Sequence, residues 1–456
     1  MFDSHKIDDY FDGKRPFDNA KTDDKPKTSG WLRFVKLGFP CLAAAIFGVM
    51  LVMPNIKKSV DLQNDITVPR KNEMEKLHIE ETVYYATDAK NRVSTVHADS
   101  VDEVAPGSQE VQINNPKAQI AADNGNWNIA SEIGFFNQGT NLLKLNGRVV
   151  AQNEDGTVVK TETVFYDFNA EYGHGEQLVE ADGKWGDLEA ASFEYFKLKN
   201  ILVLKGRHII NTSQGILTAE KETRFFQNEH KSVSQGNVIV RKDNNVFYAD
   251  VVTAYYTAKN ELERVEADGN IRILMSKGSP VGLAPKQNSG MAQASAEAFE
   301  YMKNGNILVL KGPHVITTSD GVLTAEHETR YFQDAQKSVS IGNVVIKQAD
   351  NTLRADMMTA YYGKNNELKK VEATGNVKVV TPKGTAVGEK GIYTPNNAKV
   401  ELIGKVQIEQ QGNFINGDRA ETDLNTQISK ITGDKKTGGR ISGTFYSKRK
   451  TENEQK

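Results

Sequence analysis

Residues 194–274 and 300–380 are two copies of one sequence unit. They align without a gap at an offset of 106 residues, and about 46 of the 81 paired positions are identical. One copy reads NILVLKGRHIINTSQGILTAE from Asn200, and the other reads NILVLKGPHVITTSDGVLTAE from Asn306. Duplicated units usually pack against one another, so we expect the chain to form a repetitive architecture. The Gly-, Ser-, Pro- and Asn-rich segment 276–293 predicts a surface loop between the copies.

A shorter signature recurs in and around the copies: a glycine, an apolar residue two positions later, and another two positions after that. It reads GNVIV at Gly236, GNIRI at Gly269, GNVVI at Gly342, GNVKV at Gly375 and GKVQI at Gly404, with a looser GRVVA at Gly147. Side chains alternate between the faces of a strand, so both apolar positions share one face. Each glycine predicts a turn or bulge where a strand begins. The predicted one-sided stripe consists of Val149, Val238, Val240, Ile271, Ile273, Val344, Ile346, Val377, Val379, Val406 and Ile408.

The position between the two apolar residues is chemically mixed and suits an outer face. It is occupied by Ile239, Arg272, Val345, Lys378 and Gln407. Two interpretations of the apolar face remain open at this point. Every β-sandwich has such a face in its closed core, and an open apolar lining has the same pattern.

The composition favours an all-β fold of antiparallel strands. Glycine is plentiful at 37 residues, proline is sparse at 12, and short alternating segments are separated by breaks such as KDNN and KNNE. We therefore expect jelly-roll or β-solenoid units stacked end to end, with edges that need capping or that add a partner's strand. The 57 basic and 59 acidic residues nearly cancel without a dense basic block, which excludes nucleic acid as an expected partner.

One segment predicts a transmembrane helix. Residues 37–56, LGFPCLAAAIFGVMLVMPNI, contain no charged residue, and twenty residues at about 1.5 Å each span a bilayer core of about 30 Å. A cleaved signal peptide fits less well, because 36 residues precede the segment and no small-x-small site follows it. The slight excess of Lys and Arg before the segment predicts a cytoplasmic N-terminus. Residues 1–36 and 447–456 read as disordered tails.

Ordered segments after this stretch resemble the LptC family, the bitopic periplasmic component of the lipopolysaccharide-export machinery. They are YYATDAKNRVSTVHADSVDEV from Tyr84, INNPKAQIAADNGNWNIASEIGFFNQ from Ile113, LLKLNGRVVAQNEDGTVVKTETVFYDF from Leu142 and VEADGKWGDLEAASFEY from Val179. Beyond about residue 207, the duplicated region and INGDRAETDLNTQISKITGDKKTGGRISGTFY from Ile415 resemble LptA, of the OstA-like group. The chain departs from the LptC pattern by continuing far past residue 210. It therefore looks like an LptC fused to LptA-like units, predicted as 57–207 and 208–446.

The resemblance implies a single-pass inner-membrane protein with a periplasmic β-jellyroll that carries lipopolysaccharide toward the outer membrane. Its implied partners are lipopolysaccharide, the export ABC transporter, and an LptA-like or LptD-like protein bound through edge strands. It assigns the apolar stripe to the lining of a lipid groove. An exposed acyl chain costs about 0.8 kcal/mol per CH₂ in water, so a carrier needs such a lining.

The alternative is a non-catalytic periplasmic or surface β-solenoid used as a scaffold or adhesin, with a closed interior. An enzyme is not expected, because the sequence has no G-x-x-x-x-G-K-[ST] loop, no G-x-S-x-G elbow and no complete H-E-x-x-H motif. No cofactor or metal is expected either. His208 and His314 occupy equivalent places in the copies, but each is alone in its copy, which favours a structural role.

Overall fold

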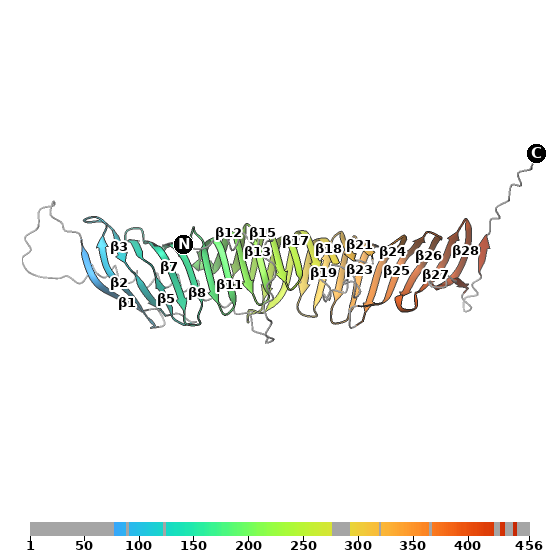
Figure 1. Ribbon diagram of the computed structural model, residues 1–456, viewed down its shortest axis with the longest axis horizontal. Coiled ribbons are helices and arrows are strands. Elements are labelled where there is room, and N and C mark those ends of the chain that lie inside the picture. Colours follow the sequence, from blue (N-terminus) through green and yellow to red (C-terminus); the bar gives the residue numbers. More distant parts are fainter. Residues whose placement is uncertain are drawn as a thin grey trace, which may run out of the picture. The chain divides into compact units, whose positions relative to one another are not determined.

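The computed structural model describes residues 77–87, 91–121, 125–275, 292–318, 321–363, 367–423, 429–433 and 441–444. Over these residues the chain forms strands β1–β30 and two short 3₁₀ turns, η2 (Lys197–Lys199) and η3 (Pro395–Asn397). Neighbouring strands pair antiparallel, for example β1 with β2, β11 with β12 and β24 with β25. The predicted all-β, antiparallel fold is confirmed (Figure 1).

The chain divides into two compact units. Unit 1 comprises Met1–Lys242 and Val251–Glu263, and unit 2 comprises Asp243–Asp250 and Arg264–Lys456. Strands β16 (Asn245–Tyr256) and β17 (Leu262–Met275) contribute residues to both units.

Unit 1 contains β1 (His78–Thr87), β2 (Val93–Glu103), β3 (Glu110–Asn114), β4 (Lys117–Ile120), β5 (Trp127–Ala130), β6 (Ile133–Asn137), β7 (Leu142–Asn153), β8 (Val158–Asp167), β9 (Tyr172–Gly175), β10 (Val179–Gly183), β11 (Gly186–Phe196), β12 (Ile201–Thr212), β13 (Gly215–Ala219), β14 (Glu222–Phe226) and β15 (Lys231–Lys242). Unit 2 contains β18 (Ala292–Met302), β19 (Ile307–Lys311), β20 (His314–Thr318), β21 (Gly321–Ala325), β22 (Glu328–Phe332), β23 (Lys337–Gln348), β24 (Asn351–Tyr362), β25 (Leu368–Thr381), β26 (Gly384–Thr394), β27 (Lys399–Gln410), β28 (Asn413–Asp423), β29 (Ser429–Thr432) and β30 (Ser442–Thr444).

Long strands in both units bend at glycine bulges. The pairing register shifts between Asn146 and Val149 on β7, between Ile341 and Val344 on β23, and between Ile403 and Val406 on β27. Shifts at the same kind of site occur on β17 and β25. A bulge inserts one residue and bends the strand, so the two halves of each long strand run in different directions. The bulges predicted from the glycine signature are confirmed at these five strands, but the predicted position was wrong, because the bulges lie within long strands and not where a strand begins.

Gly375 illustrates why the signature begins with glycine. Its φ is +79°, in the region that L side chains rarely adopt, and a Cβ there would collide with the Asp356 side chain. We expect Gly375→Ala to lower the free energy of unfolding by about 1–3 kcal/mol, because backbone strain and crowding add. Urea unfolding followed by circular dichroism measures this loss. Gly412→Ala is the control for backbone strain alone, because Gly412 has a φ of +80° with nothing within 4 Å of a Cβ. Equal stability of Gly375→Ala and the unaltered chain would contradict the bulge argument.

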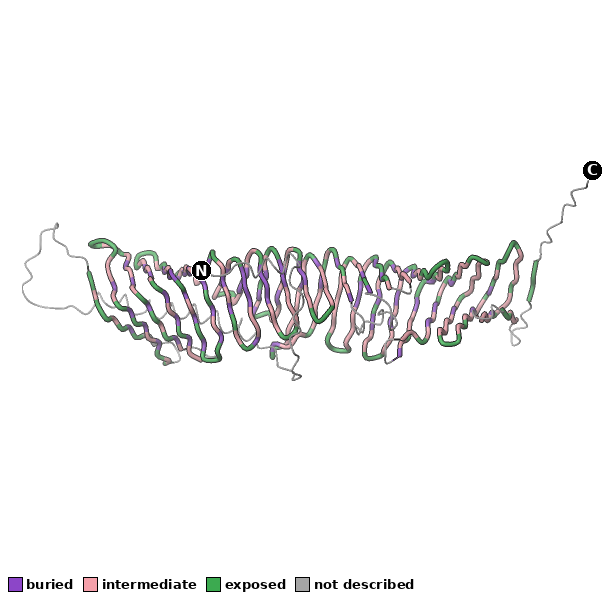
Figure 2. The backbone as a smooth tube through the Cα atoms, viewed as in Figure 1, coloured by how far each residue is buried: buried purple, intermediate pink, exposed green. Residues whose placement is uncertain are grey.

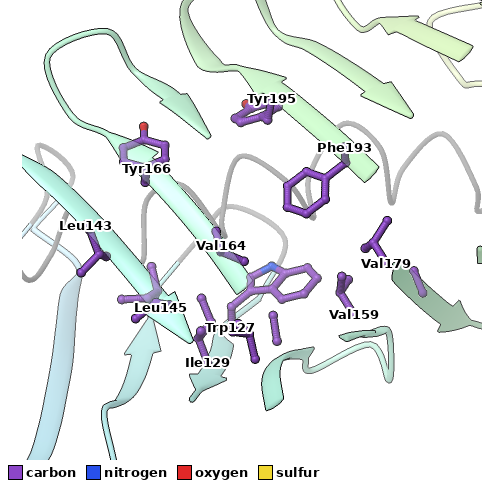
Figure 3. Packing of buried hydrophobic residues seen from close by; sticks show 14 of the residues in the cluster. Trp127, Ile129, Leu143, Leu145, Val159, Val164, Tyr166, Val179, Phe193 and Tyr195 are labelled. Carbon is purple, nitrogen blue, oxygen red and sulfur yellow. The ribbon is translucent and has the colours of Figure 1, made fainter. Parts of the chain in front are cut away.

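Unit 1 has a core filled by large rings. Trp127, Tyr166, Phe193 and Tyr195 are 1–3 % exposed and belong to one buried cluster, which Figure 3 shows together with the aliphatic side chains around them. One buried cluster of unit 2 differs in side-chain size, because it contains four alanines and no ring. It consists of Ala325, Val344, Ala355, Met358, Ala373, Val377, Leu402, Val406 and Ala420.

Several predicted segments lie outside the described residues. These are the tails 1–36 and 447–456 and the transmembrane helix over 37–56. Within the described residues, no helix is both long enough and apolar enough to span a membrane. The loop predicted over 276–293 ends earlier than expected, because Ala292 and Gln293 already pair with Met275 and Leu274 as the first residues of β18.

Candidate functional site

A continuous apolar row crosses ten strands of unit 2. Each member of this row is paired with the next across neighbouring strands, so all ten side chains share one face of the sheet. We call it the inner row of unit 2, and it runs Ile273, Ala294, Ile316, Leu323, Ile346, Leu353, Val379, Ala386, Ile408 and Ile415. No polar side chain interrupts it. Nine strand spacings of about 4.8 Å give it a length of about 43 Å.

The stripe residues predicted from the sequence fall into two sets. The first apolar position after each bulge is deeply buried: Val238 and Val344 are 0 % exposed, and Ile271, Val377 and Val406 are 1 % exposed. Val149, from the looser signature, is 2 % exposed. The second position is only half-buried in the five exact signatures, whereas Ala151 of the looser signature is 1 % exposed. The five half-buried residues are Val240, Ile273, Ile346, Val379 and Ile408. The second set, and not the first, is therefore accessible to solvent.

Unit 1 has a corresponding apolar row, but most of it is inaccessible. The row runs Tyr84, Val96, Ala118, Ile129, Ala151, Val159, Ala181, Leu188, Ile210, Leu217 and Val240. From Ile129 to Ile210 its members are 1–6 % exposed, and they pack in the ring-filled cluster of unit 1. In unit 2, by contrast, every member from Leu323 to Ile415 is half-buried. Figure 2 shows the burial of the backbone along the chain. Unit 1 thus has a closed core along most of its row, and unit 2 presents apolar surface.

Six members of the unit 2 row are not among the stripe residues predicted from the sequence. They are Ala294, Ile316, Leu323, Leu353, Ala386 and Ile415. Alternation within GVLTA and TLRAD points to Leu323 and Leu353, whereas in GTAVG and NFING the adjacent apolar residues Val387 and Phe414 obscure the pattern. Alternation alone does not reveal which residues align across strands, because that depends on the register.

The predicted outer-face positions are largely confirmed. Arg272, Lys378 and Gln407 are exposed, and Val345 is half-buried. Ile239 is an exception at 6 % exposed, because its cross-strand neighbour Thr218 is also buried, at 0 %. Ion pairs cover other parts of the outer face, such as Lys311 Nζ to Glu300 Oε2 at 2.6 Å. Exposed pairs of this kind add little stability and chiefly keep the face soluble.

A separate cavity of about 460 Å³ lies on unit 2 beside β18, β20, β21 and β23. Val315, Thr324 and Val345 line it with Glu297 and Glu326. Val315 pairs with Thr324 and Thr324 with Val345, one position along each strand from the members of the inner row. Because neighbouring positions on a strand point to opposite faces, these side chains face away from the row.

His208 and His314 each end a short buried hydrogen-bond chain. In the first copy, Nε2 of His208 lies 2.6 Å from Thr223 Oγ1, which lies 2.8 Å from Ser234 Oγ, and Nδ1 lies 2.8 Å from the Gly206 carbonyl oxygen. His314, Thr329, Ser340 and Gly312 repeat these contacts at the same distances. Both ring nitrogens are therefore used within the fold, and each histidine joins strands on either side of a bulge. Among the described residues, no three His, Cys, Asp or Glu side chains gather as a metal site.

The buried histidines predict acid sensitivity. Burial lowers the pKa of His208 from 6.5 to about 4 and also lowers the pKa of His314. The folded state thus prefers neutral His208, whose stabilising contribution is complete above pH 6.5 and is lost as the pH falls toward 4. We expect His208 to account for a loss of about 3 kcal/mol in the free energy of unfolding over this range. Urea unfolding at successive pH values measures it, with His208→Gln as the comparison. The same loss in His208→Gln would contradict this assignment.

These features define a class of protein: a repetitive antiparallel β protein with a long apolar row on one face of its sheet. Comparison with known families is more specific. Residues 41–208 match the family model described as lipopolysaccharide-assembly, LptC-related. Residues 217–336 and 322–428 match the model described as LptA/(LptD N-terminal domain) LPS transport protein. The resemblance to an LptC fused to LptA-like repeats is thereby confirmed.

Among solved structures, the chain is similar to LptH, the LptA homologous periplasmic component of the lipopolysaccharide transport device from Pseudomonas aeruginosa. The two are 21 % identical over 27 % of this chain and 94 % of that chain, with a TM-score of 0.25. A search of curated proteins finds no match.

Proposed function

We propose that this protein carries lipopolysaccharide from the inner membrane across the periplasm, without catalysing a reaction. The observation that carries the proposal is the uninterrupted apolar row of unit 2, which is half-buried from Leu323 to Ile415. The LptC-related match and the LptA/LptD-related match support the same assignment. In this proposal the row lines a groove that shields the acyl chains of the lipid.

The energetics of lipid transfer fit a row of this length. Exposing a chain of about ten CH₂ groups to water costs about 8 kcal/mol. A lining that covers the chain over its whole length removes most of that cost, whereas a single polar break would restore part of it. The row of about 43 Å is longer than a single extended acyl chain of this size, so one chain fits along part of it.

The proposed layout follows the family resemblance. Residues 37–56 anchor the chain in the inner membrane with residues 1–36 in the cytoplasm, 57–207 form the LptC-like jellyroll, 208–446 form the LptA-like repeats, and 447–456 form the tail. The lipid is accepted from an ABC transporter and passed to an LptA-like or LptD-like protein through strand addition at a sheet edge. Strand β1 pairs with β2 and is a candidate edge strand for this contact. Two apolar side chains are exposed there: Tyr85 on β1 is 64 % exposed, and Val93, which pairs with the last residue of β1, is 56 % exposed.

Depletion of the protein in its own cells tests this function. The expected result is that newly made lipopolysaccharide accumulates in the inner membrane and that its arrival at the outer membrane falls, measured by pulse labelling and membrane fractionation. Restoring the unaltered chain restores delivery. Normal delivery after complete depletion would contradict the transport function and favour the scaffold alternative.

A further inference from the structure

One inner-facing position differs between equivalent strands. Phe193 on β11 and Phe299 on β18 are equivalent at the 106-residue offset. The pairing of strands gives the corresponding residue on β26. Phe299 pairs with Ala267, and the residue equivalent to Ala267 at the 106-residue offset is Ala373. Ala373 pairs with Gly391, so Gly391 takes the place of the ring. At this one position the interior therefore receives a ring from β11 and from β18, and none from β26.

The ring at β18 does not stand alone. The Phe299 ring lies 5.0 Å from the Phe247 ring, centroid to centroid, with an interplanar angle of 54°. Phe299 also packs against the small cluster of Ala294, Leu310 and Ile316. Both rings are half-buried, so they lie on the accessible part of the inner surface. The ring pair thus borders the beginning of the inner row of unit 2.

Exposure along the inner row changes beside this ring pair. Ala294 and Ile316, next to Phe299, are each 1 % exposed, and every later member from Leu323 to Ile415 is half-buried. At β26, where the glycine replaces the ring, the nearest atoms to a Cβ on Gly391 belong to Val377, Leu402 and Ala373, at 3.1–3.6 Å. These three neighbours are aliphatic, and none of them is a ring.

We propose that the Phe247–Phe299 ring pair is the end wall of an acyl-chain site that extends from Leu323 to Ile415. The proposal rests on the proposed function and adds a position within it. Two rings in contact occupy volume that an acyl chain would otherwise take, and close packing leaves no room for both. Ile273 lies on β17, between the ring-bearing strands β16 and β18 in the chain, and packs against the same small cluster as Phe299. Acyl chains accordingly lodge along Leu323–Ile415 and are excluded from Ile273 by the rings.

The two copies supply a matched pair of positions for the test. Ile273 and Val379 are equivalent at the 106-residue offset, are both half-buried, and both belong to the inner row of unit 2. A photoreactive residue is placed at one or the other in the full chain, which is then illuminated with purified lipopolysaccharide. We expect capture at Val379 to exceed capture at Ile273 at least about tenfold, an equilibrium difference of about 1.4 kcal/mol.

Removing the ring should erase this difference. In Phe299→Ala we expect capture at Ile273 to rise to within about twofold of capture at Val379, and in Phe299→Leu, which keeps more of the packing, we expect a smaller rise. Phe332→Ala removes a ring that Lys337 covers at 5.1 Å elsewhere in unit 2, and it should leave capture at Ile273 low. Equal capture at both positions in the unaltered chain would overturn the end wall while supporting the transport function. Absence of capture at both positions would overturn the transport function itself.

Discussion

Val379→Asp is expected to reduce the lipopolysaccharide retained by the purified full chain at least about tenfold. Val379 lies in the middle of the inner row of unit 2, between Leu353 and Ala386 on the neighbouring strands. A carboxylate there must lose its hydration when an acyl chain covers the row, at a cost of several kcal/mol. Because Val379 is only half-buried, the charged side chain can remain hydrated in the lipid-free protein, which should still fold. Lipid bound per protein after gel filtration, determined by mass spectrometry, measures the effect.

The matched control is the adjacent residue on the same strand. Lys378 is exposed on the opposite face, so Lys378→Asp introduces the same side chain outside the row. We expect Lys378→Asp to retain lipid at the level of the unaltered chain. If Val379→Asp is folded and binds as much lipopolysaccharide as Lys378→Asp does, the row is not the lipid-contacting surface.

Trp127→Ala is expected to lower the free energy of unfolding of unit 1 by about 3–5 kcal/mol. Trp127 is 1 % exposed, and its ring lies among Ile129, Val159 and Val164 in the cluster of unit 1 (Figure 3). Truncation removes buried apolar surface and leaves a cavity that the surrounding strands can only partly fill. The loss is measured by urea unfolding with ring fluorescence and circular dichroism.

An exposed apolar residue of the same unit provides the comparison. Leu198 is 75 % exposed, so Leu198→Ala is expected to change the free energy of unfolding by less than about 0.5 kcal/mol. A loss below about 1 kcal/mol in Trp127→Ala would show that the interior of unit 1 is loosely packed. The contrast between a closed unit 1 and an accessible unit 2 would then fail.

The sequence alone predicts the strand faces well, because alternation and glycine bulges are local properties. Ile346, Val379 and Ile408 are placed on the inner face by their spacing from Gly342, Gly375 and Gly404, and the register of the sheet agrees. Ile239 is buried although its spacing predicts an exposed, outer-face position. Its exposure depends on its cross-strand partner Thr218, which the local sequence of its own strand does not reveal.

The sequence does not predict which inner positions are accessible. Val377 and Val379 are both valines on one face of β25, yet Val377 is 1 % exposed and Val379 is half-buried. The difference in exposure goes with distance from the bulge, because Val377 is the first residue paired after it and Val379 lies two residues further on. Likewise, the closure of unit 1 depends on where Trp127 and Phe193 meet in space, which no local pattern contains.

The division of the chain is a second property that periodicity does not reveal. The duplicated sequence suggests boundaries at the copies, whereas the division between the units falls within β16 and β17, inside the first copy. Repeats of one kind share their composition, so the sequence offers no signal for this division.

The central claim is that the inner row of unit 2 contacts lipid, and photocrosslinking in cells tests it most directly. A photoreactive residue is placed singly at Ile346, Val379 and Ile408, and at the adjacent exposed positions Lys347, Lys378 and Gln407. We predict that lipopolysaccharide is captured from the three inner positions and not from the three outer ones. Capture from neither set, or equal capture from both, would contradict the account.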